Sequence, residues 1–238
     1  MGLLLSLLSF FLNNVLLVFV AASSSDSKVA VLLYSQKVAT IALKTVLHFN
    51  KHLDNTWRIQ IFYDSRKIPL NYWHSKLKNH FSKFKDRFLF ADFGNVVHDR
   101  DSLNRFMILN TTFWRSVAGN VILIVQPDAS ICNGTSYKID RFLSYDFIGA
   151  PFLYNWISEK SSVPLDEFIP VTNDEFFGCN GGFSLRSRKA MIDCSLYALA
   201  NPSTVATIPP EDLYFSKCLK HYLNRTVSLP SKQVEKGL

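Results

Sequence analysis

A run of five consecutive apolar residues, Val121 to Val125, limits the folds open to this chain more than any other feature. Strands that face water on one side alternate apolar and polar residues, whereas a continuous apolar run predicts a strand buried on both faces, in the middle of a parallel sheet. The run ends abruptly in Gln126, Pro127 and Asp128. Because ligands bind beyond the carboxyl ends of strands in open α/β sheets, we expect Asp128 at a ligand-binding edge.

The segments around this run alternate between the periods of strands and helices. The predicted strands are residues 29–34, 58–64 and 87–93, and the predicted helices are residues 38–52, 74–87 and about 102–114. This alternation predicts an α/β fold with a mostly parallel central sheet and helices on both faces. With 238 residues, of which 48% are hydrophobic, the chain suits one full-sized domain, which we place at residues 28–225, before a short tail at 226–238.

The first 22 residues form a separate targeting segment. Residues 2–22 carry no charge, are dominated by Leu, Phe and Val, and are just long enough to span a bilayer. Small residues before the serine run at 23–25 resemble a signal-peptidase site. Residues 1–22 are therefore predicted to be a cleaved signal peptide or an uncleaved signal anchor. Either places the remaining chain in the secretory pathway, in the Golgi or ER membrane or lumen, or outside the cell if the segment is cleaved.

Sequons and cysteines agree with an oxidising, lumenal environment. N-glycosylation sequons begin at Asn110, Asn133 and Asn224. The cysteines are Cys132, Cys179, Cys194 and Cys218. Two disulfides could form among them in three connectivities, between which the sequence does not choose. Their spacing matches no zinc module, so we expect structural or free thiols.

Two short motifs resemble parts of a ligand cleft. Asn180-Gly181-Gly182 opens a predicted strand, and because glycine lacks a Cβ, a ligand can approach this backbone closely and meet bare N–H donors. About thirty residues later, the carboxylate pair Glu211-Asp212 follows Pro210. Proline and acidic residues also favour helix N-termini for structural reasons alone, so this pair by itself indicates a helix start.

Five stretches, taken in chain order, carry a resemblance to a known family. They are residues 113–114, 125–129, 145–151, 180–188 and 210–215. Together they resemble the domain-of-unknown-function family 5672, whose members are regarded as glycosyltransferases of the GT-A type. The resemblance extends from about residue 28 to residue 221. It implies a single GT-A-like domain, the fold of nucleotide-diphospho-sugar transferases, that moves a sugar from a nucleotide-sugar donor to an acceptor hydroxyl of a glycan or glycoconjugate.

The resemblance also implies a metal site. GT-A enzymes typically hold the donor diphosphate through Mn²⁺ or Mg²⁺ bound by an Asp-x-Asp motif at a strand end, and hard oxygen ligands suit both ions. Asp128 is the candidate metal ligand, whereas Gln126 replaces the first acid of the motif and carries no charge. This replacement puts the metal requirement in doubt. Asp128 is also open to the simpler interpretation of a turn residue after Pro127.

Further roles follow from the same resemblance. Asp212 or Glu211 would be the general base that deprotonates the acceptor hydroxyl if the reaction inverts, or would hydrogen-bond that hydroxyl if it retains. The candidate donor- and acceptor-binding residues are Gln126, Asp128, Asn180, Gly181, Gly182 and Arg186. Arg186 would pair with phosphate, unless it is simply a solvated arginine on an exposed strand. Tyr154, Trp156 and Tyr214 could stack on sugar faces, unless they belong to the core.

Other features narrow the function classes. The family pattern continues with a further carboxylate and a late histidine, so we expect a truncated member. The spacing of His221 is that of a helix and indicates a surface residue rather than a ligand.

The net charge of +7 and pI of about 9.2 fit an anionic substrate, an acidic membrane surface or glycans. We expect no nucleic-acid binding from a secreted chain. The sequence contains no Walker or dinucleotide-type glycine loop and no Gly-x-Ser-x-Gly motif.

Three hypotheses therefore remain from the sequence. The first is a glycosyltransferase, which requires Asp128 and Glu211-Asp212 to meet in one cleft beside Gly181-Gly182. The second is a catalytically inactive relative that binds glycans or nucleotide sugars, and Gln126 favours it. The third is a structural protein of the secretory pathway, whose carboxylates would point away from any pocket.

Overall fold

The structure, a computed structural model, describes residues 27–33, 39–81, 86–94, 97, 99–131, 139–151 and 179–223. The predicted targeting segment at residues 1–22 and the tail at 226–238 lie outside the described residues. Within the described ranges, every helix is too short or too polar to cross a membrane.

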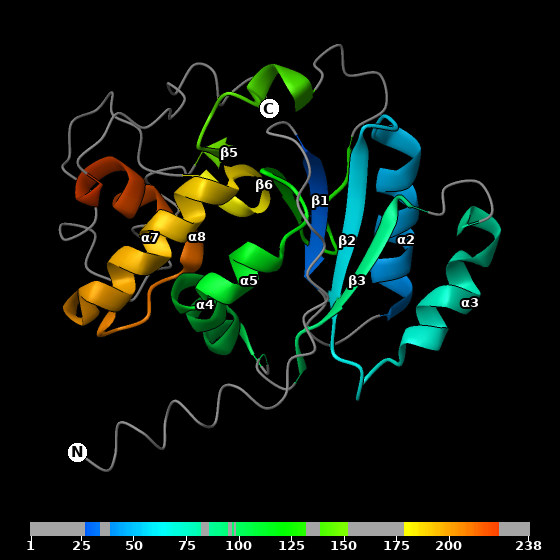
Figure 1. Cartoon of the computed structure of the whole chain (residues 1–238), viewed down its shortest axis with the longest axis horizontal. Helices are drawn as coiled ribbons and strands as arrows, with labels where there is room; N and C mark the ends of the chain where they lie inside the picture. The colour runs from blue at the N-terminus through cyan, green and yellow to red at the C-terminus, as the bar shows by residue number, and fades with distance from the viewer. Residues whose placement is uncertain are drawn as a thin grey trace.

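A six-stranded sheet forms the centre of the fold, with helices on both sides (Figure 1). Its strands are β1 (Lys28–Leu33), β2 (Trp57–Tyr63), β3 (Phe88–Asp92), β4 (Val121–Val125), β5 (Phe147–Pro151) and β6 (Cys179–Ser187). Their order in the sheet is β3-β2-β1-β4-β6-β5. Strands β1 to β4 are parallel, whereas β6 runs antiparallel to both β4 and β5. The predicted α/β fold with a mostly parallel sheet is thus confirmed.

Two groups of helices cover the two faces of this sheet (Figure 1). One face carries α2 (Ala39–His52) and α3 (Leu70–Phe81). The other carries α4 (Arg100–Leu109), α5 (Thr111–Ser116), α7 (Arg188–Ala200) and α8 (Glu211–Lys217). Short turns of other helix types complete the described chain at η2 (Ile139–Phe142), η4 (Pro202–Val205) and η5 (Cys218–Tyr222).

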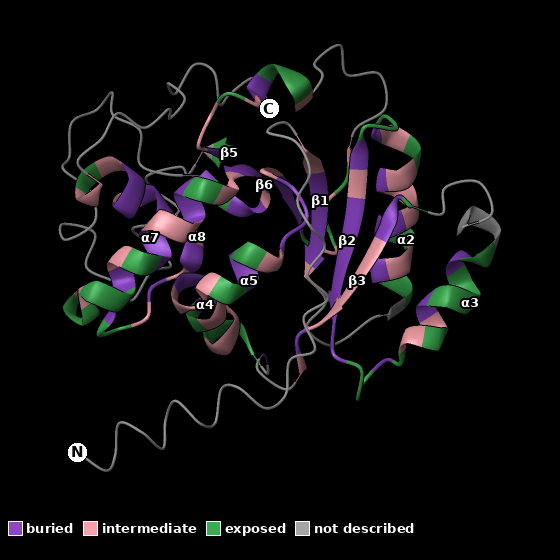
Figure 2. Cartoon of the chain, viewed as in Figure 1, coloured by how far each residue is buried: buried purple, intermediate pink, exposed green. Residues whose placement is uncertain are grey.

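Strand β1 shows why the central strands lack polar alternation. Val29 and Val31 pack on one face with α4, α5, α7 and α8. Ala30 and Leu32 pack on the opposite face with α2 and α3. Both faces of the central strands are therefore buried (Figure 2), as the continuous apolar runs predicted.

The helix predicted from residue 102 to residue 114 is interrupted at Asn110. Asn110 has φ −104° and ψ 88°, outside the helical region, and its side-chain oxygen accepts the N–H of Phe113 at 2.9 Å. This contact caps α5, while α4 begins slightly earlier than expected, with a capping box between Asp99 and Ser102. The expectation of one continuous helix is wrong because the Asn110 side chain competes with the helical backbone for hydrogen bonds.

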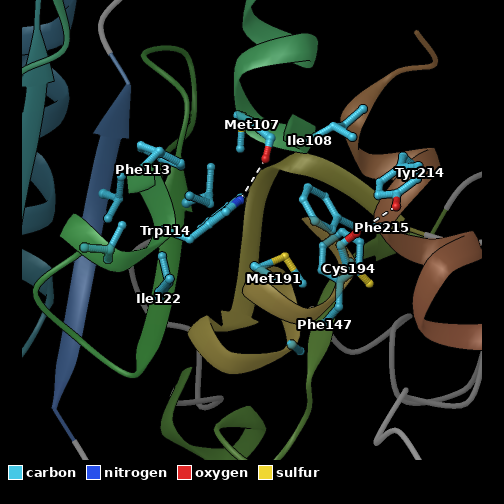
Figure 3. Packing of buried hydrophobic residues seen from close by; sticks show 14 of the residues in the cluster. Met107, Ile108, Phe113, Trp114, Ile122, Phe147, Met191, Cys194, Tyr214 and Phe215 are labelled. Carbon is cyan, nitrogen blue, oxygen red and sulfur yellow. Dashed lines mark hydrogen bonds between the residues drawn. The ribbon is translucent and has the colours of Figure 1, made fainter. Parts of the chain in front are cut away.

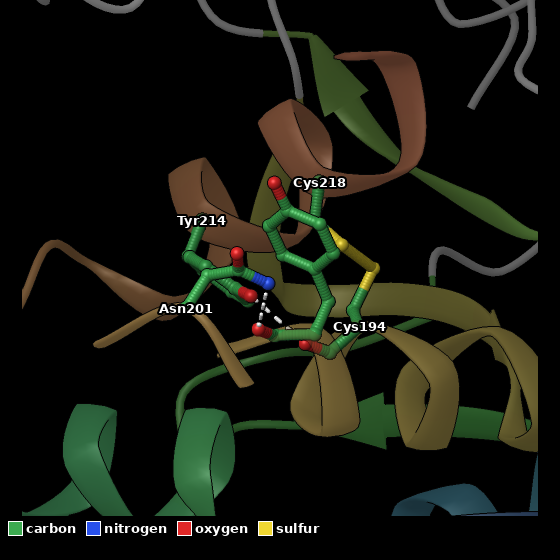
Figure 4. The surroundings of a disulfide bond; sticks show 5 residues. Cys194, Asn201, Tyr214 and Cys218 are labelled. Carbon is green, nitrogen blue, oxygen red and sulfur yellow. Dashed lines mark hydrogen bonds between the residues drawn. A yellow bond between two sulfur atoms is a disulfide. The ribbon is translucent and has the colours of Figure 1, made fainter. Parts of the chain in front are cut away.

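A disulfide ties α7 to the end of α8 (Figure 4). Cys194 of α7 is bonded to Cys218, and the Tyr214 hydroxyl donates to the Cys194 carbonyl at 2.8 Å. Cys179 is buried in β6, and Cys132 lies outside the described side chains. Tyr214 is only 1% exposed, so of the two interpretations open from the sequence, the core position is the correct one.

We expect this disulfide to contribute substantially to stability. It closes a loop between residues 24 apart in sequence, which restricts the unfolded chain by about 3 kcal/mol in the chain-entropy model. Denaturant unfolding of the wild type should therefore shift to lower denaturant on reduction. The Cys194→Ala/Cys218→Ala variant should be destabilised to a similar extent and should show no comparable response to reductant. An equal response of both proteins would contradict the assignment.

Candidate functional site at the carboxyl end of β4

Three elements meet where β4 ends. Because β6 runs antiparallel to β4, the first residues of β6 lie beside the last residues of β4, and the Gln126 N–H donates to the Gly182 carbonyl at 2.7 Å. The first turn of α8 closes on the same place, since the Gly181 N–H donates to Asp212 Oδ2 at 3.1 Å. Gln126, the glycine pair and the start of α8 therefore come together, although they are far apart in sequence.

The two glycines make this approach possible. A Cβ on Gly181 would lie 2.2 Å from Glu211 Oε1 and 2.6 Å from Arg186 Nη2. A Cβ on Gly182 would lie 2.5 Å from Gln126 Oε1. Other side chains of the protein thus occupy the space that Cβ atoms at positions 181 and 182 would fill.

The glycine N–H groups are also satisfied within the protein. Gly181 donates to Asp212, and Gly182 donates to Asn180 Oδ1 at 2.8 Å. The expectation of bare N–H donors for a ligand is therefore wrong. These glycines instead allow the side chains of Gln126 and of α8 to lie close to the backbone of β6.

Arg186 and Glu211 form a buried ion pair beneath these glycines. Arg186 Nη1 lies 2.6 Å from Glu211 Oε2, and Nη2 lies 2.9 Å from Oε1, so the pair is bidentate. Arg186 is fully buried, and its remaining donors reach the Ser184 hydroxyl at 3.0 Å and the Gly181 carbonyl at 3.2 Å. Each guanidinium nitrogen therefore has an acceptor inside the protein.

Three aromatic rings surround the same guanidinium. Its central carbon lies 4.8 Å from the ring centroid of Phe147, 5.7 Å from that of Phe215 and 5.9 Å from that of Trp114. Figure 3 shows these rings in the packed core. The sequence left open whether Arg186 is solvated or pairs with phosphate, and both interpretations are wrong. Aromatic rings enclose its side chain, and Glu211 already neutralises its charge.

Glu211 anchors α8 rather than facing an open cleft. Both of its carboxylate oxygens accept from Arg186, and its backbone N–H donates to Asn104 Oδ1 at 3.2 Å. Asn104 was not among the residues expected from the sequence. The sequence pattern that could have identified Asn104 is its helical spacing from the apolar residues Met107 and Ile108, with which it shares the buried face of α4.

The surroundings of Asp212 raise the pKa of its carboxyl group. Burial, followed by the neighbouring negative charge of Glu211, raises its pKa to about 6, against the lowering effects of the Gly181 N–H, Arg186 and the Leu213 N–H. Its two oxygens accept from Gly181 and from the Leu213 N–H at 2.9 Å, which fixes the carboxyl group. The pKa of Asp212 therefore lies well above that of an ordinary aspartate.

The segment after β4 forms a turn that exposes Asp128. The Ala129 N–H donates to the Gln126 carbonyl at 3.0 Å, and Asp128 lies exposed within this turn. Asp128 is thus a turn residue with an outward carboxylate, which leaves both interpretations from the sequence open. Asn180 is also exposed, beside the Gln126 carboxamide.

The other candidates are placed as follows. His221 is exposed in η5, as expected of a surface residue. Tyr154 and Trp156 lie outside the described residues. Among the side chains that the structure describes, no group of three or more His, Cys, Asp or Glu residues is arranged to hold a metal ion.

The fold is similar to that of a solved glycosyltransferase. "Mannosyltransferase PcManGT from Pyrobaculum calidifontis in complex with GDP-Man and Mn2+" aligns with a TM-score of 0.51 and 11% sequence identity. The alignment covers 88% of this chain and 56% of the mannosyltransferase chain, so this chain spans little more than half of that protein. Together with the sheet order, this similarity defines a GT-A-like fold.

The sequence identifies the family within this fold class. A family model described as "Protein of unknown function (DUF5672)" matches residues 87–237, which is more than half of the chain. The chain therefore belongs to this family, as its motifs predicted. No curated protein matches the sequence. The predicted domain boundaries at residues 28 and 225 stay a prediction.

The two glycines should differ in their tolerance of a methyl group. Gly181→Ala forces a new Cβ into the buried Glu211–Arg186 pair and should cost about 2 kcal/mol or more. Gly182→Ala meets mainly the end of the exposed Gln126 side chain, which can move, and should cost less than about 1 kcal/mol. Urea unfolding of both variants measures the contrast. Equal losses would show that the Gly181 environment differs from that described.

The raised pKa of Asp212 should appear in the pH dependence of stability. The folded protein binds the Asp212 proton more tightly than the unfolded chain, so ionisation of this group costs stability as pH rises. Relative to Asp212→Asn, the wild type should lose up to roughly 3 kcal/mol of unfolding free energy between about pH 4 and about pH 7. The control Asp101→Asn, at an exposed position in α4, should show no such trend. If the unfolding free energy of the wild type minus that of Asp212→Asn stayed constant or rose with pH, the raised pKa of Asp212 would be refuted.

Proposed function

We propose that this protein transfers a sugar from a nucleotide-sugar donor to an acceptor hydroxyl. The observation that carries the proposal is Asp212, a carboxyl group with its pKa raised to about 6 and held against Gly181, beside the strand end that presents Gln126 and Asp128. The GT-A-like fold and the family membership support it. Because one fold hosts many functions, the site residues carry the chemical argument.

Asp212 is the proposed general base. In an inverting transfer, its carboxylate would accept the proton of the acceptor hydroxyl while that oxygen attacks the anomeric carbon and the nucleoside diphosphate leaves. A carboxyl group with a pKa near 6 is largely ionised at neutral pH and is more basic than an ordinary aspartate. In a retaining transfer, Asp212 would instead hydrogen-bond the acceptor hydroxyl.

Glu211 and Arg186 would support this role without contacting substrate. Their ion pair joins α8 to β6 and fixes the helix turn that carries Asp212. The negative charge of Glu211 also raises the pKa of Asp212. We therefore assign proton transfer to Asp212 rather than to Glu211.

The metal that the fold family implies does not fit the described residues well. The mannosyltransferase structure is a complex with Mn²⁺, but here the end of β4 offers the single carboxylate of Asp128 and the carboxamide of Gln126. The carboxamide lies against Gly182 and Asn180. One carboxylate makes a weak site for a hard divalent cation, so we derive no step through a metal. Asp128 would bind the donor by accepting hydrogen bonds from its hydroxyl groups rather than by contacting its diphosphate.

A second candidate function is donor binding without turnover. The uncharged Gln126, at the position where GT-A enzymes typically have the first acid of an Asp-x-Asp motif, favours it. Such a protein would bind a nucleotide sugar or glycan and would neither transfer nor hydrolyse the sugar.

We further propose a location in the secretory pathway, in the Golgi or ER, or outside the cell. The apolar segment at residues 1–22 and the three sequons motivate this proposal. The Cys194–Cys218 disulfide supports it, since such bonds persist in oxidising compartments.

A panel of nucleotide sugars, with and without Mn²⁺ and beginning with GDP-mannose, tests the proposed function on the full chain. Asp212→Asn should retain donor binding and lower kcat by roughly 10²- to 10⁴-fold, because only the base is removed. Asp128→Ala should weaken donor binding, whereas Asp101→Asn should behave like the wild type. In an inverting transfer, the acidic limb of the kcat/KM profile, which reports the free enzyme, should have a pKa of about 6.

Three results would oppose this assignment. Unchanged binding and turnover in Asp128→Ala would remove Asp128 from the site. Unchanged kcat in Asp212→Asn would exclude it as the base. Tight donor binding with neither transfer nor hydrolysis in the wild type would select the second candidate function.

A further inference from the structure

Side chains of helix α2 contact the backbone of the turn that carries Asp128. The Thr45 hydroxyl donates to the Pro127 carbonyl and also lies 3.0 Å from the Ile41 carbonyl within its own helix. One turn further along α2, His48 Nε2 lies 3.0 Å from the Ile131 nitrogen and 3.1 Å from the Ile131 oxygen. Residues three apart share one helix face, so Thr45 and His48 reach the beginning and the end of the same segment.

The segment is fixed on one side and open on the other. Ala129 and Ile131 pack against the core cluster that α2 shares with the sheet, and Thr45 is only 6% exposed. Asp128, between these anchors, is exposed. The contacts therefore restrain the backbone around Asp128 and leave its carboxylate accessible.

The His48 ring is itself held in place. It lies 4.1 Å from the His52 ring between centroids, and the His52 ring is in turn held by its Nδ1, which lies 2.8 Å from the backbone carbonyl oxygen of residue 48. Its edge contact with Phe49 has a centroid distance of 5.6 Å. A ring restrained in this way offers Nε2 at a fixed position, which suits the restraint of a backbone segment 83 residues away in sequence.

We propose that Thr45 and His48 are positioning residues for donor binding, because they set the backbone of residues 126–131 and thereby the place of the Asp128 carboxylate. The inference rests on the proposed function for its consequence, but the restraint itself can be measured separately. Neither residue needs to touch the substrate.

Hydrogen exchange and kinetics together test this inference on the full chain. In Thr45→Val and His48→Ala, the peptide spanning residues 126–131 should exchange about 5- to 10-fold faster, as expected from one lost hydrogen bond. The KM for the best nucleotide sugar of the panel should rise about 5- to 10-fold, with kcat changed less than about 2-fold. A purely structural role would instead alter exchange throughout the domain and lower the active fraction without moving KM.

Matched variants separate position from folding. Thr45→Ser keeps the hydroxyl, and His48→Gln keeps a polar nitrogen and oxygen near the place of Nε2, so both should restore slow exchange and low KM. Lys44→Ala, on the exposed side of α2, should match the wild type.

The outcomes distinguish this inference from the proposed function. Unchanged exchange at residues 126–131 in both Thr45→Val and His48→Ala would overturn the restraint. Faster exchange at residues 126–131 with an unchanged KM would overturn the role of Thr45 and His48 in donor binding. It would still support their restraint of this segment. A wild type that binds no nucleotide sugar would refute the proposed function, and with it the positioning role, while exchange still decides whether α2 holds the turn.

Discussion

The buried pair of Arg186 and Glu211 determines how the candidate site is assembled. Two charges removed from water cost several kcal/mol each, and their attraction offsets this cost only when the geometry is good and the remaining donors are satisfied. Here the pair is bidentate, Ser184 and the Gly181 carbonyl accept two further N–H groups, and aromatic rings pack around the guanidinium. Loss of one partner would leave an unpaired buried charge, which typically costs about 3–5 kcal/mol.

This pair links structure to chemistry through its neighbour. Because Glu211 is tied to β6, the next residue, Asp212, is held against the Gly181 N–H. Burial and the charge of Glu211 raise the pKa of Asp212, while its hydrogen bonds limit the shift. The ion pair thus stabilises the junction of β6 with α8 and lies beside a carboxyl group with a raised pKa.

The sequence predicted the parts of the fold that depend on local patterns. The runs that form β1 and β4 are apolar because both faces of the sheet are covered, and this pattern is visible without coordinates. The break at Asn110 was missed because helical periodicity continues across it, although asparagine is a common cap. The family motifs also identified the segments that meet at the candidate site.

The roles of individual side chains were harder to predict. Gly181 and Gly182 indicate a close approach, but the sequence does not show whether a ligand or another side chain fills the space. Arg186 follows Ser184 in an alternating strand that could face water, and only the position of Glu211 in space shows that it is buried. Asn104, Thr45 and His48 act through contacts across the fold, which no local pattern specifies.

The ion pair also affects which alignment of β6 with β4 is stable. Arg186 lies opposite Ile122 in the antiparallel ladder of β4 and β6. A slip of one residue would turn every side chain of β6 to the other face and move the arginine into the apolar layer beneath α2, away from its carboxylate. An uncompensated charge there is heavily penalised, so misaligned pairings are disfavoured. The arginine therefore favours the native alignment of β6 with β4, in addition to its part in the candidate site.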